Sequence, residues 1–354
     1  MSSRPPLRAA VIGTSLFGSF IDDQLAATPE LLPSSQAACY TTHPRTQLVA
    51  GCDLDVERLA AFGERWGVSQ EHLYTDYREM LARERPDVVS VTTRWSHTKD
   101  DIMPDVARSG VRGIYSVIPV ATSMGHANEL LALVEKHGIK FASAYPRRWN
   151  PHYQHVKKLV ENGEIGDIVS ITTVGAGTLL HDTTHDFDAM SYWAGDPEPA
   201  WAVGRVEPEP LDKHGKPLQD AKGSGYVEHK NGVRFFVEGL SFPGSSTYVL
   251  SGTKGRIITI NDCRDVDLWR HPPVTSDRWM SREPQPRAEF TRSTYYLAVS
   301  ELIAAIDEDR QPSTNARVAV RNMEYSLAIH ASQRSGGGRV NFPLEDHQLA
   351  IDAW

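Results

Sequence analysis

The sequence predicts a two-domain α/β protein, in which a doubly wound parallel sheet precedes a second α+β domain with a large, mainly antiparallel open sheet. The chain has 354 residues, which is enough for two separate cores. Its first part alternates short apolar runs with amphipathic segments, and from about residue 167 the pattern changes to alternating strands. We expect residues 1–122 to form the first domain and 123–354 the second, with helices near 123–162 and 313–335 packing back on the first.

Five apolar runs predict the strands of the first domain. They are too uniformly apolar to have a solvent face, which is typical of parallel strands buried on both faces. Three segments with helical spacing lie between them and end in Gly or polar residues. A Pro- and Ser-containing insertion at 27–47 is expected to be a surface loop, or else to shape an interface or a lid. The runs are "RAAVIG", "QLVAGCD", "DVVSVTT", "VRGIYSV" and "KFASAY", and the helical segments are "VERLAAFGERWG", "TDYREMLARER" and "GHANELLALVEKHG".

The second half carries a strong hairpin signal. Asn231-Gly232 separates two strand-like runs in "YVEHKNGVRFFVEG", and this dipeptide favours a tight turn between antiparallel strands. Apolar spacing predicts one helix after Ser293 or Thr294 as N-cap, and a second over "NARVAVRNMEYSLAIHASQR" that the following glycines end. The stretch 207–225 is rich in Pro, Gly and charge and is the expected mobile loop.

Composition excludes several classes of protein. The net charge of -8 and the absence of long Lys or Arg runs argue against nucleic acid as a partner. No apolar stretch is long enough to span a bilayer, and the start "MSSRPPLRAAVIG" lacks the pattern of a signal peptide. Three scattered cysteines fit neither a disulfide framework nor a thiolate zinc site. We therefore expect a cytoplasmic protein without a membrane partner.

A glycine loop follows the first predicted strand. In "AVIGTSLFGSF", Gly13 and Gly18 stand in the register G-x-S-x-x-G, so Ser15 occupies the place of the middle glycine of the dinucleotide-binding fingerprint. The helix N-terminus at Leu16 and Phe17 would present amide groups to a pyrophosphate. Asp53 closes "LVAGCD" and is the candidate acid for the adenosine ribose. No Arg follows it immediately to bind a 2′-phosphate, which favours NAD over NADP.

The segment "HDTTHDFDAM" places two histidines, His181 and His185, four residues apart among three aspartates. This spacing puts two side chains on one face of a helix. Three interpretations remain open: an acid/base pair, a polar helix start, or a metal site completed by Asp182 or Asp188. We predict no bound metal, because the same spacing is common in proteins without one.

Taken together, the chain resembles the Gfo/Idh/MocA oxidoreductases, the family of glucose-fructose oxidoreductase and inositol dehydrogenase. The resemblance implies an N-terminal Rossmann domain, a second domain whose open sheet often forms an oligomer interface, and sugar or polyol substrates bound between the nicotinamide and that sheet. It implies a homo-oligomer, a dimer or a tetramer. The segments that carry it are "AVIGTSLFGSF", "LVAGCDLDVERLAAF", "PDVVSVTTRWSHTKD", "VRGIYSVIPVATS", "YPRRWNPHYQHVKKLVENGEIGDIVSI", "HDTTHDFDAMSYWAGDP" and "FPLED".

One family motif is altered here. The family's Glu-Lys-Pro motif supplies a lysine to the reacting hydroxyl, but this chain has Val117, Ile118 and Pro119 in its place. Isoleucine has no group that can donate to a substrate oxygen. The resemblance matches His185 to the family histidine, which would make it the general acid/base, and places His181 where the family has Asp.

Other side chains are candidates for the gap that Ile118 leaves. The stretch "YPRRWNP" offers an Arg for a carboxylate or hydroxyl and a Trp for stacking on a sugar, although Arg148 in an ordinary ion pair and Trp149 in the core are equally simple explanations. His97 resembles a family position near the cofactor. The candidates are, for catalysis, His185, His181, Arg148 and Tyr145; for the cofactor, Gly13, Ser15, Leu16, Phe17, Gly18, Asp53, Thr93, His97, Ile118 and Pro119; and for substrate, Trp149, Asp182 and Asp188.

The leading functional hypothesis is an NAD-dependent enzyme that oxidises a carbohydrate or polyol hydroxyl by hydride transfer, with NADP as the less favoured cofactor. A second hypothesis is transient oxidation followed by elimination or isomerisation of a glycoside or sugar acid, with NAD regenerated in the site. A third is a nucleotide-binding regulator without catalysis, which the loss of the Glu-Lys-Pro polar groups favours and the retained histidines oppose.

Overall fold

The computed structural model describes residues 4–94, 96–208, 220–240, 245–271 and 279–353. They form two compact units: the first runs up to Trp149 and includes Phe290–Val320, and the second comprises Asn150–Glu289 and Arg321–Ala353. This division replaces the predicted boundary after residue 122. The segment 123–149 belongs to the first unit because its strand β6 (Lys140–Ser143) pairs with the first sheet.

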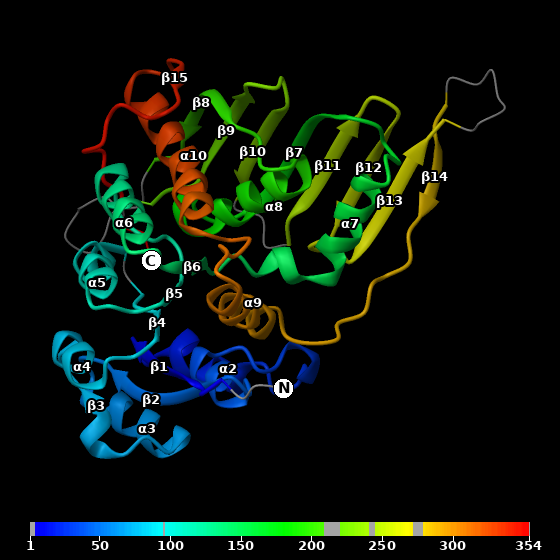
Figure 1. Cartoon of the computed structure of the whole chain (residues 1–354). Helices are drawn as coiled ribbons and strands as arrows, with labels where there is room; N and C mark the ends of the chain where they lie inside the picture. The colour runs from blue at the N-terminus through cyan, green and yellow to red at the C-terminus, as the bar shows by residue number, and fades with distance from the viewer. Residues whose placement is uncertain (1–3, 95, 209–219, 241–244, 272–278, 354) are drawn as a thin grey trace. The chain divides into compact units, whose positions relative to one another are not determined.

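The first unit is built on a six-stranded parallel sheet with strand order β3-β2-β1-β4-β5-β6, as predicted. Helix α2 contacts both α3 and α9, and α5 contacts both α4 and α6 (Figure 1). The bounds are β1 Leu7–Ile12, η1 Leu16–Phe20, α1 Ile21–Gln24, η2 Pro29–Leu31, α2 Gln36–Thr42, β2 Thr46–Cys52, α3 Val56–Trp66, η3 Gln70–His72, β3 Leu73–Tyr74, α4 Tyr77–Glu84, β4 Val88–Val91, α5 Ser96–Arg108, β5 Gly113–Ser116, α6 Met124–Lys136, η4 Pro146–Trp149 and α9 Thr294–Glu308.

The insertion at 27–47 is not the surface loop that we expected. It contains the crossover helix α2, whose residues Ala37, Cys39 and Tyr40 are fully buried. Ser35 caps this helix by accepting a hydrogen bond from the Ala38 amide. The Tyr40 hydroxyl lies 2.7 Å from Ser90 Oγ in β4, which fixes the helix against the middle of the sheet.

The second unit is built on a nine-stranded sheet with strand order β14-β13-β12-β11-β7-β10-β9-β8-β15. Its pairs are antiparallel except β7 with β10, so the prediction of a mainly antiparallel sheet is confirmed. Helices α7, α8 and α10 lie along one face of this sheet (Figure 1). The bounds are α7 Pro151–Glu161, β7 Ile168–Ala176, η5 Leu179–Thr183, α8 Thr184–Ala194, β8 Pro199–Val206, β9 Gly223–His229, β10 Arg234–Leu240, β11 Thr247–Gly252, β12 Gly255–Ile260, β13 Asp265–Arg270, β14 Ser281–Pro284, α10 Ala316–Arg334 and β15 Val340–Asn341.

Aromatic side chains join the helices of the second unit to its sheet. The rings of Tyr153 (α7) and Trp193 (α8) stack at 5.5 Å, and Tyr248 (β11) meets Trp193 edge-on at 4.9 Å. All three are at most 1% exposed. This packing fixes the last turn of α8 against α7 and the sheet beneath it.

Several local predictions are confirmed. The hairpin at Asn231-Gly232 joins β9 to β10, with Gly232 at φ +83°. Ser293 is the N-cap of α9, and α10 is followed by Gly336 at φ +76°. Of the expected mobile loop at 207–225, residues 209–219 lie outside the described residues, and its last residues begin β9.

Candidate active site

The glycine loop lies at the point of the first sheet where ligands bind in folds of this type. The strand order runs outward in opposite directions from β1 and β4, and open α/β sheets bind ligands outside the carboxyl ends of the strands at such a switch point. Thr92 Oγ1, after β4, donates a hydrogen bond of 2.5 Å to the Gly13 carbonyl. The loops that follow β1 and β4 are therefore in direct contact.

Both fingerprint glycines are required by this close approach. Gly13 has φ +90°, and a Cβ built on it would lie 2.8 Å from the Thr93 amide nitrogen. A Cβ on Gly18 would lie 2.0 Å from the Gly13 carbonyl oxygen. Between them, Ser15 is half-buried and Leu16 is exposed at the start of η1. The two glycines thus allow the close packing of the loops after β1 and β4 that the dinucleotide-binding fingerprint requires.

Asp53 follows β2 and reaches the glycine loop. Its Oδ2 accepts hydrogen bonds from the Thr14 amide (2.8 Å) and from Thr14 Oγ1 (3.0 Å), and its Oδ1 accepts one from the Asp55 amide (3.0 Å). Arg58, in the first turn of α3, places Nη1 3.2 Å from Asp53 Oδ1. The carboxylate is thus held beside the loop by four donors, and a ribose hydroxyl must take the place of one of them.

The end of β5 is apolar, as the sequence predicted. Ile118 is 6% exposed, Pro119 is buried and Val117 is partly buried against the core of this unit. A lysine nevertheless lies close by in the fold: Lys99, in the first turn of α5 after β4, has a fully buried side chain. The neighbouring Asp100 accepts hydrogen bonds from the Thr122 amide (3.0 Å) and hydroxyl (2.6 Å), which ties this turn to the segment after β5.

The remaining candidates of the first unit differ in accessibility. Tyr145 and Arg148 are buried, with exposures of 1% and 5%. Trp149 is partly buried and packs against the apolar core of its unit, which agrees with the simpler of its two explanations. His97 is exposed. The hydroxyl of Thr93 accepts a hydrogen bond of 2.9 Å from Thr98 Oγ1.

In the second unit, His181 and His185 follow β7 on successive helical segments. His181 lies in the π-helical turn η5, and His185, which is half-buried, lies in the first turn of α8. His181 Nδ1 is 3.2 Å from Asp182 Oδ1. Burial raises the pKa of Asp182, but the His181 hydrogen bond and charge, the Thr178 amide and the charge of His185 outweigh it, so the net pKa lies below its usual value. Asp182 is therefore a carboxylate next to both imidazoles.

A buried acid that the sequence did not point to holds this turn in place. Asp220 accepts hydrogen bonds from Thr178 Oγ1 (2.6 Å) and from the amides of Leu180 (2.8 Å) and His181 (2.9 Å). Burial raises the pKa of Asp220, and the donors offset part of this rise. Because the carboxylate binds the backbone of η5 directly, it fixes the orientation of the His181 backbone and so of its Cα–Cβ bond.

The two other aspartates of the motif are buried beneath the helix. Asp186 accepts hydrogen bonds from Ser246 Oγ (2.7 Å) and the Tyr248 hydroxyl (2.5 Å), which fastens α8 to the sheet. Asp188 is fully buried and accepts one from Asn322 Nδ2 (3.1 Å). Among the described residues, no three His, Cys, Asp or Glu side chains gather in a way that could hold a metal.

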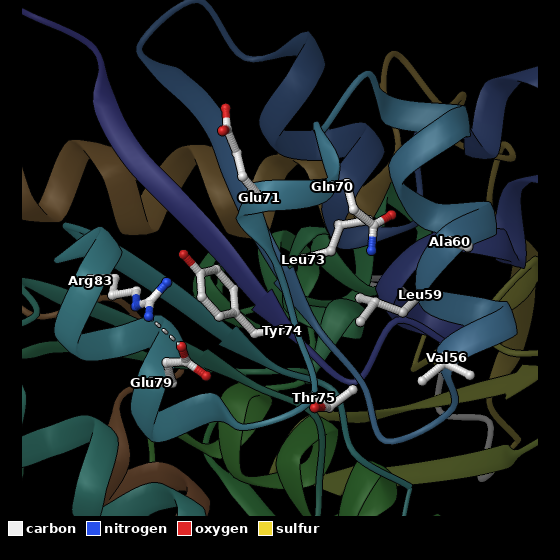
Figure 2. A pocket seen from close by; sticks show the side chains of 10 residues that line it. All are labelled: Val56, Leu59, Ala60, Gln70, Glu71, Leu73, Tyr74, Thr75, Glu79 and Arg83. Carbon is white, nitrogen blue, oxygen red and sulfur yellow. Dashed lines mark ion pairs between the residues drawn. The ribbon is translucent and has the colours of Figure 1, made fainter.

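A hollow in the first unit lies apart from all of these residues. It has a volume of about 330 Å³ and lies between α3, the edge strand β3 and α4 (Figure 2). Glu79 and Arg83 form an ion pair of 2.9 Å at its wall. None of the predicted site residues lines it. The hollow is therefore no part of the candidate site.

The structure brings the candidates together in two groups. One surrounds the glycine loop and Asp53 in the first unit, and the other surrounds the two histidines and Asp182 in the second. Sequence reasoning missed four residues, Thr14, Arg58, Lys99 and Asp220. Arg58 carried a signal, since it stands one helical turn after the N-cap Asp55, whereas Asp220 sits in a stretch that predicted only a loop.

The first unit is similar in sequence to known proteins. Residues 7–145 match the family model GFO_IDH_MocA, described as an oxidoreductase family with an NAD-binding Rossmann fold. The chain is 35% identical over 121 residues to D-apiose dehydrogenase from Paraburkholderia graminis, covering 34% of this chain and 31% of that protein. It is 25% identical to myo-inositol 2-dehydrogenase from Thermotoga maritima, covering 45% and 51%. The matches thus span about half or less of the length of these relatives.

Among solved structures, levoglucosan dehydrogenase in complex with NADH superposes with a TM-score of 0.77 at 19% identity, covering 96% of this chain and 100% of that one. This likeness shows that the two share a fold along almost the whole chain. None of the described helices combines the length and the hydropathy needed to cross a membrane. The first unit is therefore similar in sequence to the NAD-binding Rossmann fold of this oxidoreductase family, and the whole chain shares the fold of levoglucosan dehydrogenase.

Proposed function

We propose that the protein is an NAD-dependent oxidoreductase that acts on a hydroxyl group of a carbohydrate or polyol. The observation that carries the proposal is the contact between the glycine loop and the Asp53 carboxylate at the switch point of the first sheet. The relatives named for apiose and inositol support the class of substrate. The nicotinamide, when bound, supplies the hydride acceptor.

In this proposal His185 takes the proton of the reacting hydroxyl. An imidazole suits this role because its ordinary pKa lies near neutral pH. The ionised Asp182 fixes the ring of His181 through the hydrogen bond between them. We propose that His181 hydrogen-bonds the substrate or passes the proton onward.

We further propose that Lys99 supplies the amine that Ile118 lacks. Lysine is rarely buried completely, and where it is, a functional role is a frequent reason. Its fully buried side chain lies in the turn that Asp100 ties to the segment after β5. A donor at this edge would stabilise negative charge on the substrate oxygen while the proton leaves.

The test is to mix the purified protein with NAD or NADP and a panel of polyols, aldoses, uronic acids and glycosides. Oxidation predicts NADH absorbance at 340 nm together with a carbonyl product. The pairing of His181 with Asp182, which provides a second proton-transfer group, favours elimination as the second candidate; that reaction would give product without net NADH. Tight NAD binding with no product from any substrate would support the regulator instead.

We also propose that a second copy of the chain covers the outer face of the second sheet. Trp201, Tyr226 and Phe236 form a row of rings there, with successive centroids 5.0 Å apart, and Phe236 and Val174 remain more than a third exposed. Such an exposed apolar patch is typical of a binding surface. Light scattering should show a dimer or tetramer, and Phe236→Glu should shift it toward the monomer.

A further inference from the structure

An arginine in the first turn of α3 is enclosed by two carboxylates. Arg58 Nη1 lies 3.2 Å from Asp53 Oδ1, and its Nη2 lies 3.0 Å from Asp55 Oδ2. The Arg58 side chain is 40% exposed, and Leu54, between the two acids, is 88% exposed. This corner of the first unit is thus open enough to admit a larger group.

The place of Arg58 matters for the choice of dinucleotide. In folds of this type the acid after β2 binds the adenosine 2′-hydroxyl, and the phosphate of NADP is attached to that same oxygen. Arg58 therefore lies one hydrogen bond from the carboxylate that contacts this oxygen. A guanidinium is the side chain that best matches a phosphate.

The two acids keep this guanidinium from a phosphate. Asp53 and Asp55 together carry two negative charges against the single positive charge of Arg58, so the corner repels a phosphate dianion. The Arg58 donors are also directed at the carboxylates. The absence of an Arg directly after Asp53 is therefore not the whole reason why NAD is favoured.

We propose that Arg58 is able to bind the 2′-phosphate of NADP, and that its ion pairs with Asp53 and Asp55 prevent it from doing so. The inference rests on the proposed binding of a dinucleotide at this loop. It makes a specific demand: removing the acid charge should admit NADP only while Arg58 is present. If Asp53 acted by repulsion alone, its removal would admit NADP with or without Arg58.

The experiment titrates NADH and NADPH into the full-length protein and follows nucleotide fluorescence. The variants are Asp53→Asn, Arg58→Gln and the double variant. Asp53→Asn should bind NADPH about tenfold more tightly and NADH more weakly than the unaltered protein, since one charge-assisted pair to phosphate is gained. The double variant should lose the NADPH gain. Higher salt should weaken the gained binding, because the new contact is ionic.

Asp23→Asn is the matched control. Asp23 pairs with Arg65 of the same helix at 2.7 Å, so this change also frees an arginine on α3, but away from Asp53. It should leave both affinities unchanged. If Asp53→Asn does not fold, Asp55→Asn releases the other pair and keeps a good N-cap, and it should give a smaller, Arg58-dependent gain.

The outcomes separate the two ideas. NADH binding with no NADPH gain in Asp53→Asn, or a gain that survives Arg58→Gln, overturns the role of Arg58 and leaves the proposed function standing. An unaltered protein that binds neither dinucleotide overturns the proposed function itself.

Discussion

Replacing Gly18 by alanine tests the glycine loop as the cofactor site. The added Cβ would lie 2.0 Å from the Gly13 carbonyl oxygen and 3.0 Å from Thr92 Oγ1. The backbone oxygen cannot rotate away as a side chain can, so η1 must shift by more than 1 Å relative to β1. Overpacking of this kind costs about 1–3 kcal/mol of folding free energy. The shift also turns the loop amides from their direction toward a pyrophosphate.

The expected result is a loss of dinucleotide affinity. A hydrogen bond to a charged group contributes about 1.5–3 kcal/mol, so losing one weakens NADH binding by at least about tenfold. Fluorescence titration measures the affinity, and urea unfolding shows that the variant is folded. Gly67→Ala is the control: Gly67 has φ +68° and no atom within 4 Å of its built Cβ, so it should lose about 1 kcal/mol of stability and no affinity. Unchanged NADH binding in a folded Gly18→Ala would refute the reasoning.

Three further predictions concern the buried polar groups. Burial lowers the pKa of His229 from 6.5 to about 4, so the unfolded chain gains a proton first as pH falls from 6.5 to 4. His229 should therefore contribute about 3 kcal/mol to the drop in the free energy of unfolding over that range. In urea titrations His229→Gln should lose that part of the drop, whereas His330, whose pKa burial also lowers to about 4, should keep its own. Asp220→Ala leaves two backbone amides of η5 without their acceptor, so it should lower kcat more than it lowers NADH affinity. Equal losses of kcat and NADH affinity would contradict a role of Asp220 in positioning His181. Lys99→Met should lower kcat at least about a hundredfold and leave NADH binding unchanged. The control Lys140→Met removes a lysine that pairs with Asp309 in the same unit, and it should leave kcat unchanged. Equal activity of both variants would remove Lys99 from the mechanism.

Features that are local in the chain could be predicted from sequence. The first strand, its turn and the following helix are indicated by Gly13 and Gly18, and the acid after the next strand is Asp53. The dipeptide Asn231-Gly232 specifies its turn by itself. These signals work because the backbone conformation they need is set by one or two residues.

Features that depend on packing were missed. The first five residues of helix α2 are all buried, including Gln36, which accepts a hydrogen bond of 3.0 Å from Ser90 Oγ. Since only Thr41 and Thr42 at its end are exposed, periodicity does not reveal this helix. Pro104 lies inside α5, and the two-residue strand β3 is too short to give a pattern. Asp220 meets η5 from about 40 residues away in the chain, and no local rule predicts such a contact.

His185→Ala tests the central claim most directly, on whichever sugar or polyol the panel identifies. General acid/base catalysis contributes about 10²–10⁴-fold, so hydride transfer to NAD should fall at least a hundredfold while NADH affinity stays the same. A variant that reduces NAD at the original rate would contradict the account, since the proton would then leave through another group.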